Sequence, residues 1–580
     1  QQQITSQKSD EQPRLVTWNI SSNQLYALED DLVESVSFNS SNSIGIGRDN
    51  TPYAVDARFG RGFSDLYTVS LTGEKTKVTE KISSVYAINS SNEQLVYAQN
   101  EKLYLYHIKE GRSQEIDLPL GHSFFNEEDD HPTPSLRPYG FSAWSKDGKT
   151  AIINSQFDLW MLDTKTAKIT QLTNGKDEKL QHRLVTKDWR NPEFKKGDEL
   201  IISLFNENTK DSGFGTLIPG KTLKTISFES RSISGLIFPE EGNGLMYTKQ
   251  NFDESPDKFY RAALSGSETQ LTQMNPQQEE FHWTKAELIS YTNYAGKELQ
   301  GILYYPADYV PGKKYPMVTY IYEKLSSGFR SYPSPRITDY YNTGFFTQNG
   351  YFVLRPDIEF KASDPGRSSA RSLEAVVAEV VKTGMVDEKK VGLIGHSWGG
   401  YQANFVPTET DIFAASVAGA GLTNLFSMYG AISPAFGGAP ESGHFEVSQE
   451  RMVQPPYEIP EAYMNNSAVM NVHKLKTPIL MEVGDNDTNV NMRQSMEYYN
   501  VGRRAGKEMV LLIYAKEGHG LRNRNNQIDY HNRIMQWFGH YLKDEPAPLW
   551  MKEAQSYAEQ QRMLSNWKEY NGEEKGSENK

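Results

Sequence analysis

The sequence predicts two domains of different fold class, an all-β domain in the first half of the chain and an α/β domain in the second. Three observations support this division. A strand-and-turn pattern recurs through the first half, short apolar strands alternate with helical segments in the second, and 580 residues suffice for two separate cores. We expect the all-β domain over residues 1–281, the α/β domain over 282–570, and a polar, disordered tail over 571–580.

The first domain repeats one unit, made of a charged residue, an alternating strand with aromatic side chains and a polar turn. Two of these units end in the same sequence, TQLT, at 170–173 and at 269–272. Repeats of about 40 residues built from short antiparallel strands are typical of β-propeller blades, and an ordinary β-sandwich would leave the recurring ending unexplained. About six such units fit in residues 15–273, so we predict a β-propeller. The repeated strand lies at 65–73, 102–111, 158–166 and 258–266, and residues 141–149 open one unit with a strand and a tight turn.

The second domain alternates strands with helices. Its first two strands flank a turn at 293–297, which indicates a hairpin, and a helical segment such as 368–383 separates most of the later ones. This alternation predicts a mostly parallel sheet of eight strands, covered by helices on both faces. The expected strands are 287–292, 299–305, 317–322, 351–355, 391–394, 414–418, 479–483 and 509–514.

The strand at 391–394 leads directly into a G-x-S-x-G motif, Gly395-His396-Ser397-Trp398-Gly399. This motif is a nucleophile elbow, in which a strand turns sharply into a helix and small residues on either side make room for the turn. The serine hydroxyl is then exposed at the sheet edge, and the first N–H groups of the helix can stabilise an oxyanion. Ser397 is therefore the candidate nucleophile.

A serine nucleophile needs a histidine base and a carboxylate that orients it, and in this fold they follow in the order Ser, Asp, His. Asp485 and Asp487 lie in the loop after the strand at 479–483, and the residues themselves do not separate the two. His519 lies between glycines in the loop after the strand at 509–514. The carboxyl ends of parallel strands meet at one edge of a sheet, so these loops should reach Ser397.

Three other histidines are alternatives to His519 as the catalytic base. His531 and His540 fall in a helical stretch, where we expect packing or surface roles. His396 is next to the nucleophile in sequence and is expected to point away from it.

A β-propeller followed by an α/β-hydrolase domain with this elbow resembles the prolyl oligopeptidase family of serine peptidases. The resemblance covers nearly the whole chain, and its most specific parts are residues 395–401, 413–419, 487–490 and 517–520. A catalytic aspartate followed two or three residues later by valine is the family pattern, and it selects Asp487 over Asp485. The resemblance implies a catalytic triad of Ser397, Asp487 and His519, with no metal and no organic cofactor.

The resemblance also implies an oxyanion hole and an acyl side-chain pocket. The oxyanion hole would consist of the Tyr322 phenol and the backbone N–H of Trp398. Many family members continue from this tyrosine with two small residues and proline, whereas here Glu323 and Lys324 follow, so Tyr320 stays an alternative. Trp398, Tyr401 and Val490 are expected near the pocket, and Met428 and Tyr429 either line it or belong to the core.

The family implies seven or eight propeller blades, more than the units counted above. Because the chain begins at Gln1 rather than at methionine, the sequence leaves open whether the first blades are missing.

Composition restricts partners and location. The formal charge of −13, with no basic cluster, argues against nucleic acid, and no run approaches the ~20 apolar residues of a membrane span. Absence of cysteine excludes disulfides, thiol catalysis and cysteine metal sites. We therefore expect peptide substrates and a soluble protein, either cytoplasmic or exported with its signal peptide removed. Oligomeric state is not readable from the sequence.

The predicted function is hydrolysis of short peptides through an acyl-enzyme on Ser397. Two alternatives remain at this point. An esterase would use the same triad, although a propeller gives no obvious advantage for small esters. A non-catalytic propeller scaffold would follow if missing blades left the site misassembled.

Overall fold

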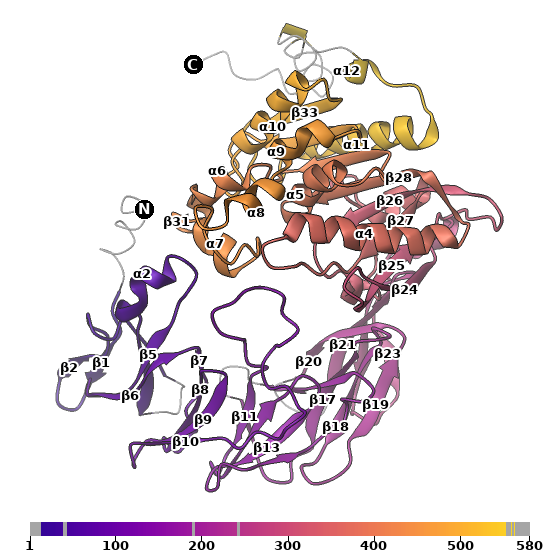
Figure 1. The fold of residues 1–580 in the computed structure, drawn as a ribbon. Helices are drawn as coiled ribbons and strands as arrows, with labels where there is room; N and C mark the ends of the chain where they lie inside the picture. The colour runs from indigo at the N-terminus through magenta and orange to yellow at the C-terminus, as the bar shows by residue number, and fades with distance from the viewer. Residues whose placement is uncertain are drawn as a thin grey trace, which may run out of the picture.

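The computed structural model describes residues 13–38, 43–187, 192–239, 244–552, 558–559 and 562. The predicted disordered tail, residues 571–580, lies outside the described residues. Both predicted fold classes are present, the repeated β-sheets in the first half of the chain and the α/β sheet in the second (Figure 1).

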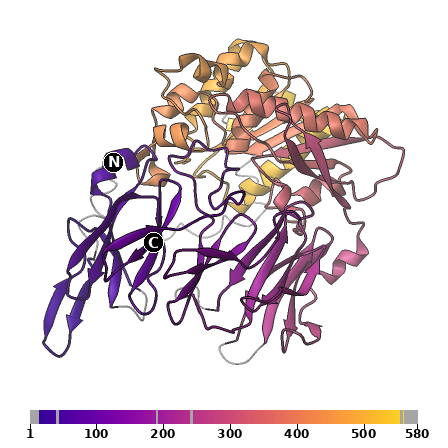
Figure 2. The ribbon, with the colours of Figure 1, turned by 60° about the horizontal axis from the view of Figure 1, so that its bottom comes forward.

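Five mainly antiparallel sheets and one hairpin make up the described part of the propeller, compared with the predicted number of about six repeat units. Both ribbon views place the first strands and the last sheet at opposite ends of a row, so the row forms an open arc (Figures 1 and 2). The strands are β1 (Val16–Asn19) and β2 (Gln24–Ala27) in the hairpin; β3 (Ser35–Ser37), β4 (Ile44–Asp49), β5 (Ser64–Ser70) and β6 (Lys75–Ile82); β7 (Ser84–Val85), β8 (Gln94–Gln99), β9 (Lys102–His107) and β10 (Arg112–Glu115); β11 (Phe141–Ser145), β12 (Thr150–Asn154), β13 (Leu159–Asp163) and β14 (Ile169–Gln171), with β16 (Glu193–Phe194) parallel to β11; β15 (Leu180–Val185), β17 (Leu200–Asn206), β18 (Ser212–Leu217) and β19 (Lys224–Glu229); and β20 (Ser232–Ile237), β21 (Leu245–Asn251), β22 (Glu254–Arg261) and β23 (Glu268–Gln270).

The repeated sequence unit corresponds to the third strand of four of these sheets, namely β5, β9, β13 and β22. The recurring TQLT ending has a structural cause. Thr173 donates its hydroxyl to Asp158 and accepts the N–H of Leu159, and Thr272 repeats both bonds with Asp257 and Lys258. The same Asp–Thr pair therefore ties the outer strand to the third strand in two different sheets.

The α/β domain contains the predicted eight-stranded sheet, in the order β24-β25-β27-β26-β28-β29-β32-β33. β24 and β25 form the antiparallel hairpin expected from the sequence, and the strands from β27 onward are parallel. The bounds are β24 (Ala286–Thr292), β25 (Glu298–Tyr304), β26 (Tyr315–Ile321), β27 (Phe352–Pro356), β28 (Val386–His396), β29 (Ala415–Gly419), β32 (Ile479–Gly484) and β33 (Met509–Tyr514).

Helices cover both faces of this sheet. One core cluster joins α4 (Pro365–Lys382), α5 (Trp398–Phe405) and α10 (Arg493–Arg504) to the sheet, and a second joins α3 (Thr343–Gln348) and α11 (Arg524–Lys543) to its other face.

None of the helices in the described part of the chain is long and apolar enough to cross a membrane. The shorter elements are α2 (Ala54–Ala57), α6 (Leu425–Tyr429), α7 (Ser442–Val447), α8 (Pro460–Asn465), α9 (Ala468–Asn471) and α12 (Leu549–Lys552), the paired strands β30 (Ile432–Ser433) and β31 (Ala439–Pro440), and the 3-10 helices η1 (Thr51–Tyr53), η2 (Pro276–Glu280), η3 (Ser326–Gly328), η4 (Val406–Thr408), η5 (Pro434–Phe436) and η6 (Val472–Lys474).

A long loop between β10 and β11 lies between the propeller and the α/β domain (Figure 1). Its residues bond across the domain interface, through Asp130 to Arg451 and through the carbonyl of Glu128 to Lys324. A separate cross-domain ion pair joins Asp211 to Arg330 at 2.8 Å. A further cross-domain ion pair joins Arg61 to Glu446, also at 2.8 Å. Charged groups therefore hold the interface at several distinct places.

Candidate active site

Ser397 occupies the sharp turn between β28 and α5, with φ 57° and ψ −116°. Non-glycine residues rarely adopt such a conformation, and surrounding packing must hold it in place. The flanking glycines allow that packing. A Cβ on Gly395 would lie 2.4 Å from the carbonyl oxygen of Gly399, and one on Gly399 would lie 2.3 Å from that of Ile321. Only glycine fits at either position, which is why the strand can turn so tightly behind the serine.

The structure brings Ser397, His519 and Asp487 into one hydrogen-bonded row. His519 Nε2 lies 2.9 Å from Ser397 Oγ, and His519 Nδ1 lies 2.9 Å from Asp487 Oδ2. The Asp487 carboxylate is fully buried, and its other oxygen accepts the N–H groups of Asn489 and Val490. Its orientation is therefore fixed from both sides.

Asp485 lies in the same loop but has a different partner. Its Oδ1 accepts the backbone N–H of Lys516 at 2.6 Å, which joins the loop after β32 to the loop after β33. Asp485 thus holds together the two loops that present Asp487 and His519, and it does not contact the imidazole.

Tyr322 lies beside the elbow. Its carbonyl accepts a hydrogen bond from Gln402 of α5, and its ring is 3.6 Å from where a Cβ on Gly399 would stand. Tyr320, two residues earlier on β26, packs on the other face of the sheet, under the guanidinium of Arg355. Of the two tyrosines, Tyr322 is the one on the side of the nucleophile helix.

The five residues expected at the acyl pocket have different surroundings. Trp398 and Tyr401 are stacked with ring centroids 4.6 Å apart and are fully buried in the core, where the Tyr401 phenol donates to the carbonyl of Asn466. Tyr401 is thus buried in this structure, and its place beside an acyl pocket stays a prediction. Val490 and Met428 are buried, and Tyr429 is half-buried.

Two buried ionisable residues beneath the site were not predicted as part of it. The ring centroid of His396 lies 5.0 Å from that of His519, and burial, with repulsion from His519, lowers the pKa of His396 to about 4. Burial, with the nearby charge of Asp487, raises the pKa of Glu482 to about 8. Both shifts favour the neutral form of the group, which limits any competition with Asp487 for the imidazole.

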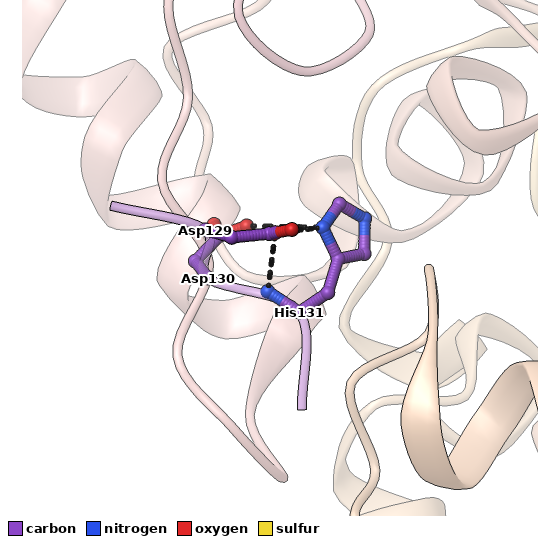
Figure 3. A group of neighbouring side chains, drawn as sticks. All are labelled: Asp129, Asp130 and His131. Carbon is purple, nitrogen blue, oxygen red and sulfur yellow. Dashed lines mark hydrogen bonds and ion pairs between the residues drawn. The ribbon is translucent and has the colours of Figure 1, made fainter. Parts of the chain in front are cut away.

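A cavity of about 600 Å³ opens beside Tyr322. The long propeller loop supplies one wall with Asp129, Asp130 and His131, whose side chains gather as drawn in Figure 3. The three side chains are close enough together to hold a metal ion, but Asp130 already accepts a hydrogen bond at 2.6 Å from Arg451. A cation here would have to displace that guanidinium, so we assign the carboxylate to the ion pair.

Comparison with known proteins shows what the catalytic half of the chain is similar to. Residues 361–545, which hold all three members of the row, match the model of the prolyl oligopeptidase family. Dipeptidyl-peptidase 5 of Porphyromonas gingivalis is 26% identical over 324 residues, 52% of this chain and 45% of that protein. The acylamino-acid-releasing enzyme of Sus scrofa is 23% identical over 426 residues, 70% of this chain and 50% of that protein. The matched regions thus span about half the length of these relatives.

Solved structures agree on the fold. A puromycin-hydrolyzing peptidase of Mycobacterium tuberculosis superposes with a TM-score of 0.61 at 13% identity, over 92% of this chain and 84% of that chain. The acylaminoacyl peptidase of Pyrococcus horikoshii superposes with a TM-score of 0.52 at 16% identity, over 92% and 95%. The matched catalytic region, residues 361–545, is thus similar to the prolyl oligopeptidase family, and the relatives that match the chain are peptidases.

Proposed function

We propose that this protein hydrolyses peptide bonds of short peptides through an acyl-enzyme on Ser397. The observation that carries the proposal is the row from Ser397 Oγ through His519 to the buried Asp487, with both hydrogen bonds at 2.9 Å. This is the arrangement that a serine needs in order to lose its proton as it attacks a carbonyl.

In the first half of the reaction, Ser397 Oγ attacks the peptide carbonyl carbon while its proton passes to His519 Nε2. Asp487 holds the imidazole in the tautomer with the proton on Nδ1 and stabilises the imidazolium that forms. The carbonyl oxygen becomes an oxyanion, which the Tyr322 hydroxyl and the Trp398 N–H would stabilise. The tetrahedral intermediate then expels the amine, which takes its proton from His519 Nε2.

In the second half, water replaces the amine. His519 removes a proton from the water as it attacks the ester carbonyl, and then returns that proton to Ser397 Oγ. One peptide bond and one water are consumed, and an acid and an amine are released. Every step uses side chains of this chain.

The names of the relatives suggest substrates for a first assay. Dipeptidyl-peptidase 5 and the acylamino-acid-releasing enzyme are named for the release of a dipeptide and of an acylated amino acid. We therefore propose a panel of dipeptidyl anilides with free and blocked amino ends, acyl-amino-acid anilides, puromycin and a simple carboxylic ester. Turnover of the ester alone would indicate an esterase and contradict the peptidase proposal.

Tyr322→Phe tests the oxyanion assignment. If the phenol donates to the developing oxyanion, we expect kcat to fall by about 10- to 1000-fold with little change in KM, as for loss of one such donor. The matched control is Tyr320→Phe, which alters a tyrosine of β26 that packs in the core cluster on the other side of the sheet. An effect on KM alone would show that Tyr322 binds substrate, and a loss only in the Tyr320 variant would move the assignment there.

Substrate length is set by the architecture around the triad, because the triad itself contacts only the scissile bond. The arc of sheets is open between its first and last members (Figures 1 and 2). We therefore expect loose size selection: a short peptide and the same sequence embedded in an unfolded protein should be cleaved at similar rates. Chromatography of both digests measures this, and cleavage of the short peptide alone would show that the site is closed in solution.

A further inference from the structure

A chain of polar side chains leads from the hydroxyl of Tyr322 toward the propeller. Gln449 Nε2 lies 3.3 Å from the Tyr322 phenol oxygen and 3.1 Å from Glu323 Oε1. Because the carboxylate can only accept, the amide must present its N–H₂ group to both oxygens. A phenol oxygen that accepts from Gln449 keeps its own proton free to donate elsewhere. Gln449 thus leaves Tyr322 as a donor, the role that an oxyanion requires.

Arg451 continues the chain. Its Nη1 donates to the carbonyl of Gln449 at 2.5 Å and lies 3.4 Å from Glu323 Oε1. Its Nη2 and Nε both donate to Asp130 of the propeller loop, at 2.6 and 3.2 Å. The guanidinium also lies over the ring of Phe360, 4.4 Å from its centroid. One side chain therefore joins the support of Tyr322 to the other domain.

Arg451 is placed there at a cost. Its side chain is 1% exposed, and its backbone has a φ of 55°, a conformation that only glycine adopts freely. A buried cation is tolerated only when it is paired and hydrogen-bonded, and loss of one partner leaves uncompensated charge. Asp130 and Glu323 are the two carboxylates that balance the charge of Arg451. Without the Asp130 charge, Glu323 alone balances the guanidinium, and we expect Glu323 to move away from Gln449.

The propeller loop contacts the Tyr322 segment at further points. Asp130 accepts the N–H of Phe360 at 2.8 Å, and Lys324 donates to the carbonyl of Glu128 at 3.3 Å. His131 lies 3.8 Å from Glu323, whose carboxylate raises the pKa of His131. Burial opposes ionisation of Glu323, but His131 and the charge of Arg451 outweigh it and lower the pKa of Glu323 to about 2. The loop is thus seated by charge as well as by backbone bonds.

We propose that Gln449, Glu323 and Arg451 are positioning residues for the Tyr322 hydroxyl, and that Asp130 completes the set from the propeller. The oxyanion donor would then be correctly oriented only while the loop between β10 and β11 is seated against the catalytic domain. This inference rests on the proposed function, since the orientation of Tyr322 matters only if Ser397 is acylated.

A double-mutant cycle between Asp130→Asn and Tyr322→Phe tests the proposal on the full chain. In the Tyr322 background we expect Asp130→Asn to lower kcat by about tenfold or more with little change in KM, because transition-state stabilisation is lost and substrate binding is not. In the Tyr322→Phe background the same change should have no further effect, since coupled residues are non-additive. Gln449→Leu, which removes the amide donor without burying a charge, should behave in the same way.

Asp211→Asn is the matched control, because it removes a carboxylate from a separate cross-domain ion pair. It should leave kcat nearly unchanged, and thermal melting of each variant checks that the fold is intact. Equal losses in both Tyr322 backgrounds, or an equal loss from Asp211→Asn, would overturn the proposal and indicate general loosening of the interface. Failure of the proposed function is distinguishable, because the wild-type protein would then not turn over the peptide anilides at all.

Discussion

Ser397→Ala should lower kcat by about 1000-fold or more and abolish labelling by a fluorophosphonate, while the protein remains folded. The hydroxyl is the only group in the hydrogen-bonded row that can form a covalent acyl intermediate, and no other side chain in that row can replace it. We also expect the free energy of unfolding to stay nearly unchanged, because the substitution leaves the backbone strain at this position as it is. Alanine adopts the φ of 57° no more easily than serine does, and the hydroxyl's bond to His519 lies partly open to solvent.

The measurement combines peptide mapping of the labelled protein with initial rates on the anilide panel. Ser416 is a useful control, because its hydroxyl is buried and donates to the carbonyl of Ala403. The folded fraction of Ser416→Ala should therefore keep both the label and the activity. A label on any other residue, or full activity in Ser397→Ala, would remove the basis of the proposed function.

Asp487→Asn should lower kcat by about 10⁴-fold, because an amide at this position favours the wrong tautomer of the imidazole. Asp485→Asn is a matched change two residues away, in the same loop. It weakens only the bond to the N–H of Lys516, so we expect a small loss. Rates for the two variants on one anilide decide between them, and the reverse ranking would mean that the loop presents a different carboxylate to His519 in solution.

The catalytic half was the part most readable from the sequence, for physical reasons. The elbow needs glycine on either side of the serine for steric reasons, so the turn can be recognised in the sequence. The alternation of strands and helices is also a strong periodic signal. Parallel strand ends then place the two later loops at the same edge. The residues alone did not separate Asp485 from Asp487, because both follow the same strand end, and it was the family pattern that selected Asp487.

Other features left no periodic trace. Tyr401 follows Ser397 by one helical turn and stacks on Trp398 in the core, a contact that the sequence alone did not indicate. His396 was expected to point away from the nucleophile, and its ring centroid lies 5.0 Å from that of the catalytic base candidate His519. The pairing of Asp130 with Arg451 joins residues 321 positions apart, and nothing in either local sequence indicates the other.

The open arc has a consequence for how the propeller domain resists unfolding. In a closed ring every sheet has two neighbours, whereas a linear stack behaves like a repeat array whose stability is a sum of nearest-neighbour terms. Its end members then fray first, and fluctuations decay toward the middle. The loop that carries Asp130 connects β10 to β11, that is, the second of the five sheets to the third. The Asp130 contact is therefore anchored away from the hairpin end of the array, so loss of order at that end can break the Arg61–Glu446 pair of the first sheet before it releases Asp130.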